Sequence, residues 1–272
     1  MKTRALSISI IAVIFVLTVR GSDAAPPVAR GFHAVQCEGA YPGHLQGVCT
    51  NDSDAIYWSF TTTLVKSDIN GRALQTIKVA SHHGDLCFHD GKIFVAVNLG
   101  QFNQPAGKAD SWVYVYDADT LRELARHKVP DLVHGAGGIA FHDGRFYVVG
   151  GLPVGAKENY IYEYDNSFAF QKRHVLASGY TLMGIQTVAF ASDGWWFGCY
   201  GNPRVLLKAD NSFKPVGKWE IDCSLGIVGL PDRKFLVARG AFEKGMGYRG
   251  RVEVAVADDK QGFRMLDPPP PE

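Results

Sequence analysis

A clear excess of charge of either sign is missing from this sequence of 272 residues. Lys and Arg together number 28 and Asp and Glu 27, which gives a formal charge of +1 at pH 7. Since no basic stripe is present either, composition gives no support to a nucleic-acid partner. After residue 25 there is also no apolar run of the length, about 20 residues, that a membrane-spanning helix needs. We therefore expect neither nucleic acid nor, once the N-terminal segment is removed, membrane as a partner.

Closely spaced metal-ligand pairs are missing as well, because the five cysteines form no Cys-x-x-Cys or similar spacing. This argues against a structural zinc site. The number is odd, so at least one thiol stays unpaired or pairs between chains even where export permits disulfides. Alternatively, buried free cysteines act as small apolar residues. The five are Cys37, Cys49, Cys87, Cys199 and Cys223.

The N-terminus has the features of a targeting segment. Two basic residues precede an apolar run of 15 residues at positions 5–19, and small residues follow at 22–24. This pattern predicts a signal peptide over residues 1–24, and so a secreted or periplasmic protein. The alternative is a retained anchor, since Arg20 directly follows the apolar run.

Glycine, with 30 residues, and aromatic residues, at 12%, are plentiful and favour β-structure with tight turns. One phrase recurs: an apolar strand, an Asp-Gly turn or a relative of it, and an aromatic-rich strand, as in "GGIAFHDGRFYVVGG" from Gly137. Asp-Gly tolerates the positive φ of two-residue hairpin turns. Five copies are present, with turn markers at Asp54, Asp90, Asp143, Asp193 and Asp232.

Each copy continues into a third strand that ends near another Asp, such as "YIYEYD", and a more polar fourth strand. Four strands per repeat is typical of a propeller blade, so we predict an all-β, five-bladed β-propeller of four-stranded antiparallel blades. A β-sandwich, or a sixth blade, is the alternative. The predicted blades are residues 44–81, 82–132, 133–180, 181–223 and 224–262. The segment at 31–39 is left to pair with the last blade and close the ring. The domain would span 25–266, followed by a Pro-rich tail at 267–272.

Unequal repeat spacing indicates where function lies. The surplus residues fall between strands two and three, after Leu99, Gly151 and Arg239. In an up-and-down blade this connection emerges on the same face as the linkers between blades. Long loops on a rigid scaffold commonly carry function, so we expect one working face.

Polar residues of the linkers and loops on this face are the candidate site residues. Imidazole binds transition metals and titrates near neutral pH, and a nearby carboxylate would orient it. Alternatively, the histidines only hydrogen-bond neighbouring blades. The catalytic candidates are His83, Asp85 and His134, and the metal ligands, if there is a divalent metal, are His44, His83 and His134. The ligand-binding candidates are His44, Gln46, Gln186, Tyr200, Arg204, Tyr248 and Arg249.

Two resemblances accompany these residues. The phrases "FHDGRFYVV" and "YEYDNSF" resemble the secreted propellers that include NHL-repeat and gluconolactonase-like proteins, and this likeness carries no catalytic residue across. The stretch "YPGHLQGV" followed by "IYWS" is similar to the first blade of plant-type glutaminyl cyclases, with Gln46, Gly47 and Ser59 matching. Where that family has an acidic "GEG", this chain has "HGD" with Asp85.

Two functions of different classes follow. The first is a binding module, expected to be monomeric, whose face holds a small molecule, a glycan or a protein. The second is a hydrolase, lyase or cyclotransferase that uses the same residues around a metal or as an acid–base pair. The fold alone cannot choose between them, since propellers host many unrelated functions.

Overall fold

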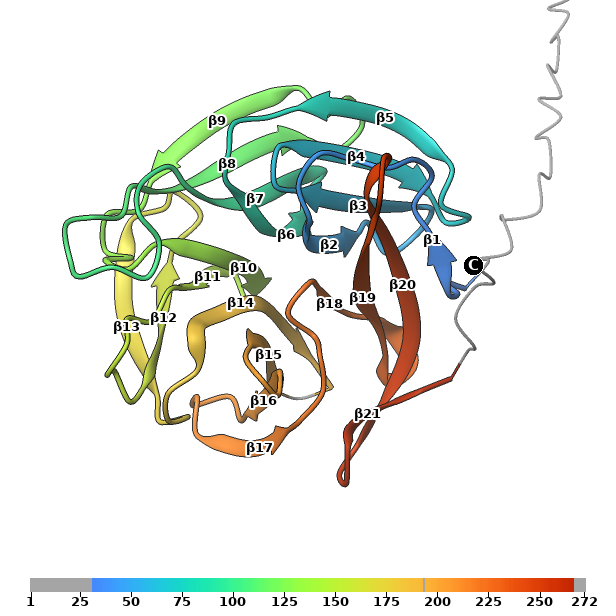
Figure 1. The fold of residues 1–272 in the computed structure, drawn as a ribbon. Helices are drawn as coiled ribbons and strands as arrows, with labels where there is room; N and C mark the ends of the chain where they lie inside the picture. The colour runs from blue at the N-terminus through green and yellow to red at the C-terminus, as the bar shows by residue number, and fades with distance from the viewer. Residues whose placement is uncertain (1–30, 193, 267–272) are drawn as a thin grey trace, which may run out of the picture. The chain divides into compact units, whose positions relative to one another are not determined.

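The computed structural model describes residues 31–192 and 194–266. Within these ranges the regular structure is β-strand, apart from one short 3-10 turn, η1, at Pro231–Arg233. The strands form five antiparallel sheets that follow one another around a ring (Figure 1). The prediction of an all-β, five-bladed propeller is therefore confirmed. Over the same residues, no helix has the length and apolarity to cross a membrane.

The first four blades each contain four strands in chain order, with the first strand innermost. Blade 1 consists of β2 (Leu45–Thr50), β3 (Ala55–Phe60), β4 (Thr63–Asp68) and β5 (Ala73–Lys78). Blade 2 consists of β6 (His83–His89), β7 (Lys92–Asn98), β8 (Ser111–Asp117) and β9 (Glu123–Lys128). Blade 3 consists of β10 (Ala136–His142), β11 (Arg145–Gly150), β12 (Asn159–Tyr164) and β13 (Phe170–Leu176). Blade 4 consists of β14 (Leu182–Ala191), β15 (Gly194–Tyr200), β16 (Val205–Ala209) and β17 (Pro215–Trp219).

Turn chemistry explains why these hairpins form where they do. Asp90 and Gly91 have φ values of 48° and 68°, and Asp143 and Gly144 have φ values of 46° and 72°. Positive φ at both central residues is the requirement of the two-residue turn that matches strand twist. The Asp-Gly pairs therefore place the first two strands of blades 2 and 3.

The fifth blade joins the two ends of the described chain. Its strands are β18 (Ile227–Gly229), β19 (Lys234–Glu243), β20 (Gly247–Asp258), β21 (Gly262–Met265) and, from the N-terminus, β1 (Val35–Gln36). Both β1 and β21 pair with β20, at different parts of its length. The Cys37 amide extends the β1 pairing by donating to Gly250 O at 2.8 Å. The predicted closure by an N-terminal strand is thus confirmed.

The first four predicted blade ranges each contain the four strands of one sheet, whereas the fifth ends at residue 262, where β21 begins, and so leaves out most of that strand. The predicted signal peptide, residues 1–24, and the Pro-rich tail, residues 267–272, lie outside the described residues. Both therefore stay predictions.

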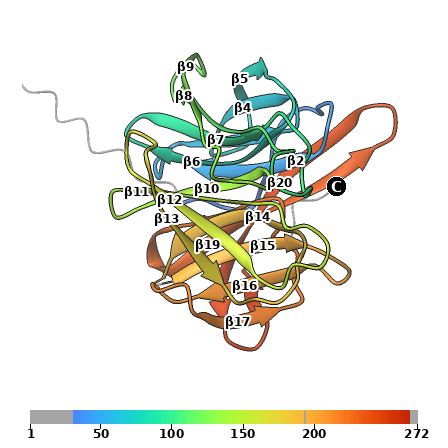
Figure 2. The ribbon, with the colours of Figure 1, turned by 90° about the vertical axis from the view of Figure 1, so that its left-hand side faces the viewer.

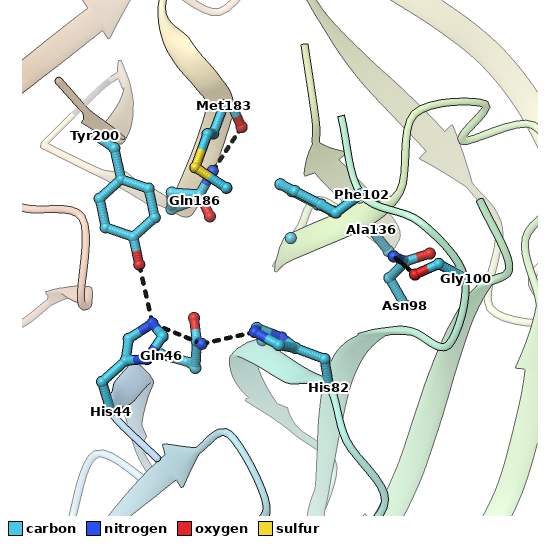
Figure 3. Close-up of a pocket in the computed structure, with 12 residues that line it drawn as sticks. His44, Gln46, His82, Asn98, Gly100, Phe102, Ala136, Met183, Gln186 and Tyr200 are labelled. Carbon is cyan, nitrogen blue, oxygen red and sulfur yellow. Dashed lines mark hydrogen bonds between the residues drawn. The ribbon is translucent and has the colours of Figure 1, made fainter. Parts of the chain in front are cut away.

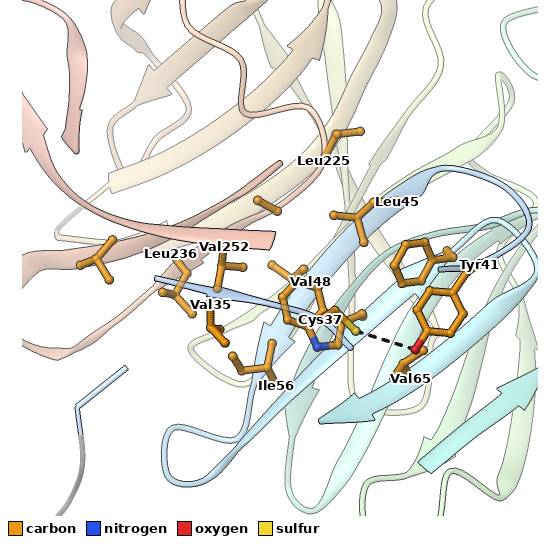
Figure 4. Close-up of a cluster of buried hydrophobic side chains, with 14 residues drawn as sticks. Val35, Cys37, Tyr41, Leu45, Val48, Ile56, Val65, Leu225, Leu236 and Val252 are labelled. Atoms are coloured by element: carbon orange, nitrogen blue, oxygen red, sulfur yellow. Dashed lines mark hydrogen bonds between the residues drawn. The ribbon is translucent and has the colours of Figure 1, made fainter. Parts of the chain in front are cut away.

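Apolar residues fill the seams between blades. Figure 4 shows the seam where the ring closes, with side chains from the N-terminal segment, blade 1 and blade 5. Val35 from β1 and Val48 and Ile56 from blade 1 pack together with Leu236 and Val252 from blade 5. Closure therefore buries a core as well as pairing backbone.

All five cysteines are unpaired, and four of them are buried. Burial raises the pKa of the Cys37, Cys199 and Cys223 thiols to about 12. Because the thiolate is the reactive form, these groups are poor nucleophiles and behave as small apolar residues.

The third insertion differs from the expected loop. The stretch after Arg239 continues β19 to Glu243, turns, and returns as the start of β20 at Gly247. In Figure 2 this orange-red hairpin reaches out beyond the other blades. Four cross-strand pairs, from Gly240↔Gly250 to Glu243↔Gly247, continue the β19–β20 ladder through the insertion, so the insertion is a two-stranded arm.

Candidate functional site

A cavity of about 300 Å³, which we call the mouth cavity, lies at one end of the central channel, the channel mouth (Figure 3). Its walls come from the starts of innermost strands, from the end of β7 and the loop after it, and from the end of β15. The lining residues are His44, Gln46, His82, Gly84, Asn98, Gly100, Phe102, Ala136, Gly137, Met183, Gln186 and Tyr200. Four predicted residues, His44, Gln46, Gln186 and Tyr200, are thus brought together here.

β-Bulges explain how the innermost strands present these side chains. The pairing with the second strand shifts between Leu45 and Gly47, and again at equivalent places in blades 2, 3 and 4. A bulge leaves a residue unpaired and re-aims its side chain. Gln46, Gly84, Gly137 and Gln186 lie within these four irregular stretches, so the same local feature builds the pocket in each blade.

A hydrogen-bond chain connects the polar groups of one wall. The Gln46 amide nitrogen lies 2.9 Å from His44 Nε2 and 3.0 Å from His82 Nε2 (Figure 3). Because the amide nitrogen only donates, both imidazole Nε2 atoms accept, and each ring carries its proton on Nδ1. The Tyr200 hydroxyl lies 3.3 Å from the same His44 nitrogen. The Gln46 oxygen is left free to face the cavity.

The wall groups are uncharged near neutral pH. Desolvation lowers the pKa of His44. Desolvation, followed by the neighbouring His44, lowers the pKa of His82, although His82 is an exposed residue. Burial raises the pKa of Tyr200 to about 12. The neutral forms of all three groups are therefore favoured, and the cavity offers dipoles rather than charges.

The opposite wall is apolar and well anchored. Phe102, from the loop after β7, and Met183 lie on the side of the cavity away from His44 and His82 (Figure 3). The His134 imidazole Nδ1 bonds Gln104 O at 2.9 Å, and the Asn103 amide donates to His134 O at 3.0 Å. His134 is not among the lining residues, and its bonds instead hold the loop that carries Phe102.

Two catalytic candidates are buried below the cavity. His83 is completely buried, with Nδ1 2.6 Å from Ala80 O and Nε2 2.8 Å from the Tyr116 hydroxyl. Burial lowers its pKa to about 4, so the ring is neutral and both nitrogens are occupied. Asp85 is also buried, and its Oδ2 accepts from the Val188 amide at 3.1 Å.

Asp85 lies between two hollows of the channel. Gly84 lines the mouth cavity, whereas Leu86 lines a smaller hollow, about 140 Å³, at the other end. A Cβ placed on Gly47 would lie 2.4 Å from Asp85 Oδ1, so only glycine leaves room for this carboxyl. The carboxyl therefore fills the channel instead of facing the cavity.

The remaining candidates lie around the cavity rather than in its lining. The Tyr248 ring lies 6.0 Å from the His44 ring, at the rim. Arg204 is ion-paired with Asp222, and Arg249 on the projecting arm is ion-paired with Glu243. Both guanidinium groups are therefore occupied by carboxylates within the chain.

The structure does not bring His44, His83 and His134 together. His83 is in the core and His134 bonds the loop, so neither ring accompanies His44 at the cavity. In the part of the chain that the structure describes, no group of three or more His, Cys, Asp or Glu residues is arranged to hold a metal ion. The geometry thus gives no ligand set to the possible divalent metal.

The lining residues outside the candidate set include His82, Phe102 and Met183. His82 stands in the same linker as His83, but neighbouring residues at a strand start point to different sides. Phe102 was in a recognised insertion, and its type, a large apolar residue in a polar loop, is the signal that marks it. Met183 has no comparable signal.

The comparisons with known proteins concern the fold. The sequence matches no family model and no curated protein. The chain is similar in structure to Myxococcus xanthus glutaminyl cyclase, with a TM-score of 0.55 and 10% identity over 87% of this chain and 99% of that one. It is also similar to the computationally designed Ika4 protein, with a TM-score of 0.39 and 15% identity over 70% of this chain and 99% of the design. The likeness to the cyclase shows a shared propeller fold.

Proposed function

We propose that this propeller is a binding module for a small, neutral, hydroxyl-bearing molecule, with a sugar ring as the ligand class. The observation that carries the proposal is the character of the mouth cavity. Among the described residues that line it, none is a carboxylate, lysine or arginine. A charged ligand would lose hydration there without meeting a counter-charge, which is costly.

The free hydrogen-bonding atoms of the cavity favour a ligand that donates. The Gln46 amide nitrogen is occupied by His44 and His82, and the Gln186 amide nitrogen donates to Met183 O at 2.6 Å. The carbonyl oxygens of both glutamines remain as acceptors. Hydroxyl groups of a neutral ligand satisfy such acceptors without adding charge.

The apolar wall completes the match. Phe102 and Met183 offer carbon-rich surface opposite Gln46 and beside Gln186 (Figure 3). A sugar ring has a C–H face and a rim of hydroxyl groups, so it fits a cavity that combines apolar side chains with hydrogen-bond acceptors. The volume of about 300 Å³ is at the lower end of the range for small-molecule sites.

Titration calorimetry with neutral hexoses and disaccharides, and with their uronic acid and amino-sugar counterparts, tests the proposal. We expect a neutral sugar to bind at pH 7 and the charged counterparts to bind at least ten-fold more weakly. Gln186→Leu should weaken binding about ten-fold, since one ligand hydrogen bond is lost. Gln171→Leu, on the exposed outer strand β13, is the matched control. Equal affinity for the charged sugars, or no binding by any of the panel, would contradict the proposal.

A second candidate, an acid–base enzyme, is favoured by one observation. Two neutral imidazoles, His44 and His82, face the same cavity, and a neutral imidazole is a general base. With the fold likeness to a glutaminyl cyclase, the reaction to test is ring closure of an N-terminal glutaminyl peptide, in which the amine displaces ammonia. Ammonia release that is lost in both His44→Ala and His82→Ala, but retained in His33→Ala, would support the enzyme. No release by the wild type would exclude this reaction.

We also propose that the protein is exported and monomeric. The support for export is the N-terminal pattern over residues 1–24. The N-terminal sequence of the mature protein decides the first point, and its mass in solution decides the second.

A further inference from the structure

The projecting arm has one strand edge that its neighbour does not cover. β19 spans ten residues, but β18 pairs with it only from Phe235 to Val237. The bond from the Ala238 amide to Gly226 O, 3.0 Å, is the last one on this side. Beyond that point the chain before β18 leaves the edge, and β19 continues to Glu243 paired only with β20.

The direction of the remaining backbone groups follows from strand geometry. In an antiparallel ladder, alternate residues of a strand direct both N–H and C=O to the same neighbour. The Ala238 amide bonds toward β18, so Gly240 and Phe242 also direct their backbone groups to that side, away from β20. In the described part of the chain, no hydrogen bond engages the N–H of either residue.

The open edge is accessible and lies beside the cavity. Gly240, Ala241 and Phe242 are exposed, and the Phe242 side chain is 63% exposed. The Phe242 ring lies 5.1 Å from that of Tyr248, and Tyr248 lies 6.0 Å from His44 of the cavity lining. Because β18 is an innermost strand, a segment that continued its line along β19 would lead to the channel mouth.

We propose that the edge formed by Gly240, Ala241 and Phe242 binds an extended peptide segment of a protein partner, which adds to the sheet as a strand. Two N–H and two C=O groups at strand spacing are the complement of an extended backbone, and strand addition is a recurring mode of peptide recognition. The exposed Phe242 ring supplies an apolar contact for one side chain of the peptide. The inference does not depend on what fills the cavity.

Other occupants fit this edge less well. The tail at 267–272 is mostly proline, which has no N–H to donate to Gly240 O or Phe242 O. A second copy paired edge to edge would share only three exposed residues on each side. Stable dimers bury about 1,200 Å² or more, and a contact of three residues on each side is too small for that. A peptide, in contrast, can continue from this edge toward the channel mouth.

Proline substitution at the edge tests the proposal. The full chain is used to select binders from a displayed library of random twelve-residue peptides, and the selected peptides are assayed on two matched pairs, Phe242→Pro with Phe242→Ala and Gly240→Pro with Gly240→Ala. Proline removes the outward N–H without breaking a bond to β20, and it is tolerated at strand edges. We expect each proline variant to bind at least ten-fold more weakly than its alanine partner.

A second measurement uses the wild-type protein with modified peptides, so its result does not depend on whether the proline variants fold. Methylating the peptide amides one at a time should weaken binding at every second position, as a strand paired along one edge requires. Failure to select any peptide, equal binding to both members of each pair, or losses without two-residue periodicity would overturn the proposal. A dimer in light scattering that Phe242→Pro dissociates would overturn it in favour of a second copy. Sugar binding should be equal in Phe242→Pro and Phe242→Ala, and Gln171→Leu on the exposed strand β13 should leave peptide capture unchanged, so failure of the cavity ligand remains distinguishable from failure of the peptide edge.

Discussion

The Asp85 carboxyl group is buried in the central channel, where a negative charge is energetically unfavourable. It is 1% exposed, and its Oδ1 has no hydrogen-bond partner of good geometry among the described residues. Burial raises its pKa well above the ordinary value, although backbone N–H groups such as that of Val188 partly offset this effect. The neutral acid is therefore the form that suits the channel.

The stability of the protein should fall as Asp85 is forced to ionise. A carboxyl whose folded pKa is raised contributes stability below its unfolded pKa, near 4, and loses it as pH rises through the folded pKa. Between the unfolded and the folded pKa of Asp85, we expect the unfolding free energy of the wild type, relative to that of Asp85→Asn, to decrease by about 1.4 kcal/mol for each pH unit. Urea unfolding at a series of pH values measures this difference. A difference that does not change with pH would refute the raised pKa of Asp85.

At the residue scale, the sequence identified the right linkers but not every right side chain. Gln46 and Gln186 reach the cavity as expected from their place at the starts of innermost strands. For the pair His82 and His83, the choice depends on which residue begins the strand, and a shift of one residue exchanges the two faces. Composition and spacing do not show which residue begins the strand. His83 was therefore predicted as a site residue, although His82 is the one that lines the cavity.

At the element scale, the innermost strands of neighbouring blades are joined by a repeated ring stack. The His89 ring of blade 2 stacks on Phe141 of blade 3 at 3.5 Å, and the His142 ring of blade 3 stacks on Phe190 of blade 4 at 3.4 Å. These two histidines directly precede the Asp-Gly turns of blades 2 and 3. Their position before the turn therefore has an inter-blade packing role.

Removing one such ring should weaken the contact between two blades. Ring pairs contribute about 0.5–1.5 kcal/mol beyond the area they bury, so His89→Ala should lower the unfolding free energy by about 1 kcal/mol. His89→Phe keeps a planar ring on Phe141 and should retain most of that stability. Urea denaturation measures both, with the exposed His33→Ala as a control that changes stability by less than about 0.5 kcal/mol. Equal stability of His89→Ala and His33→Ala would show that the stack contributes nothing.

Which elements could be predicted depended on how local their signals are. The Asp-Gly hairpins have a two-residue cause, positive φ at Asp90 and Asp143, and they were found. The bulges that direct Gln46 and Gln186 into the cavity arise from pairing between strands, and no local sequence pattern predicted them. The arm after Arg239 is glycine-rich and charged, which indicates a loop, yet cross-strand pairing holds it as β19 and β20.

At the scale of the whole molecule, ring closure links the two ends of the described chain. A propeller removes exposed sheet edges by joining its last blade to its first. Here β1 pairs with β20 through Val35↔Val252, and blade 1 packs on blade 5 in the same seam. The repeat count indicated this arrangement in advance, since five equivalent blades left the segment at 31–39 without a place of its own.

Closure should therefore depend on the buried face of β1 and not on its other face. Val35 is 7% exposed within the seam, whereas its neighbour Gln36 points to the opposite side and is half-buried. Val35→Asp would bury an unpaired carboxylate and should destabilise the fold by on the order of 3 kcal/mol. Gln36→Asp introduces the same group and should cost about 1 kcal/mol or less.

Hydrogen exchange locates the effect as well as measuring it. The Cys37 amide donates to Gly250 O and the Tyr248 amide donates to Tyr41 O, so both report on the junction. In Val35→Asp we expect both amides to lose protection before those of blade 3, on the far side of the ring (Figure 1). Uniform loss of protection would instead mean that the ring opens as a single cooperative unit. Unchanged protection would mean that β1 does not hold the ring closed.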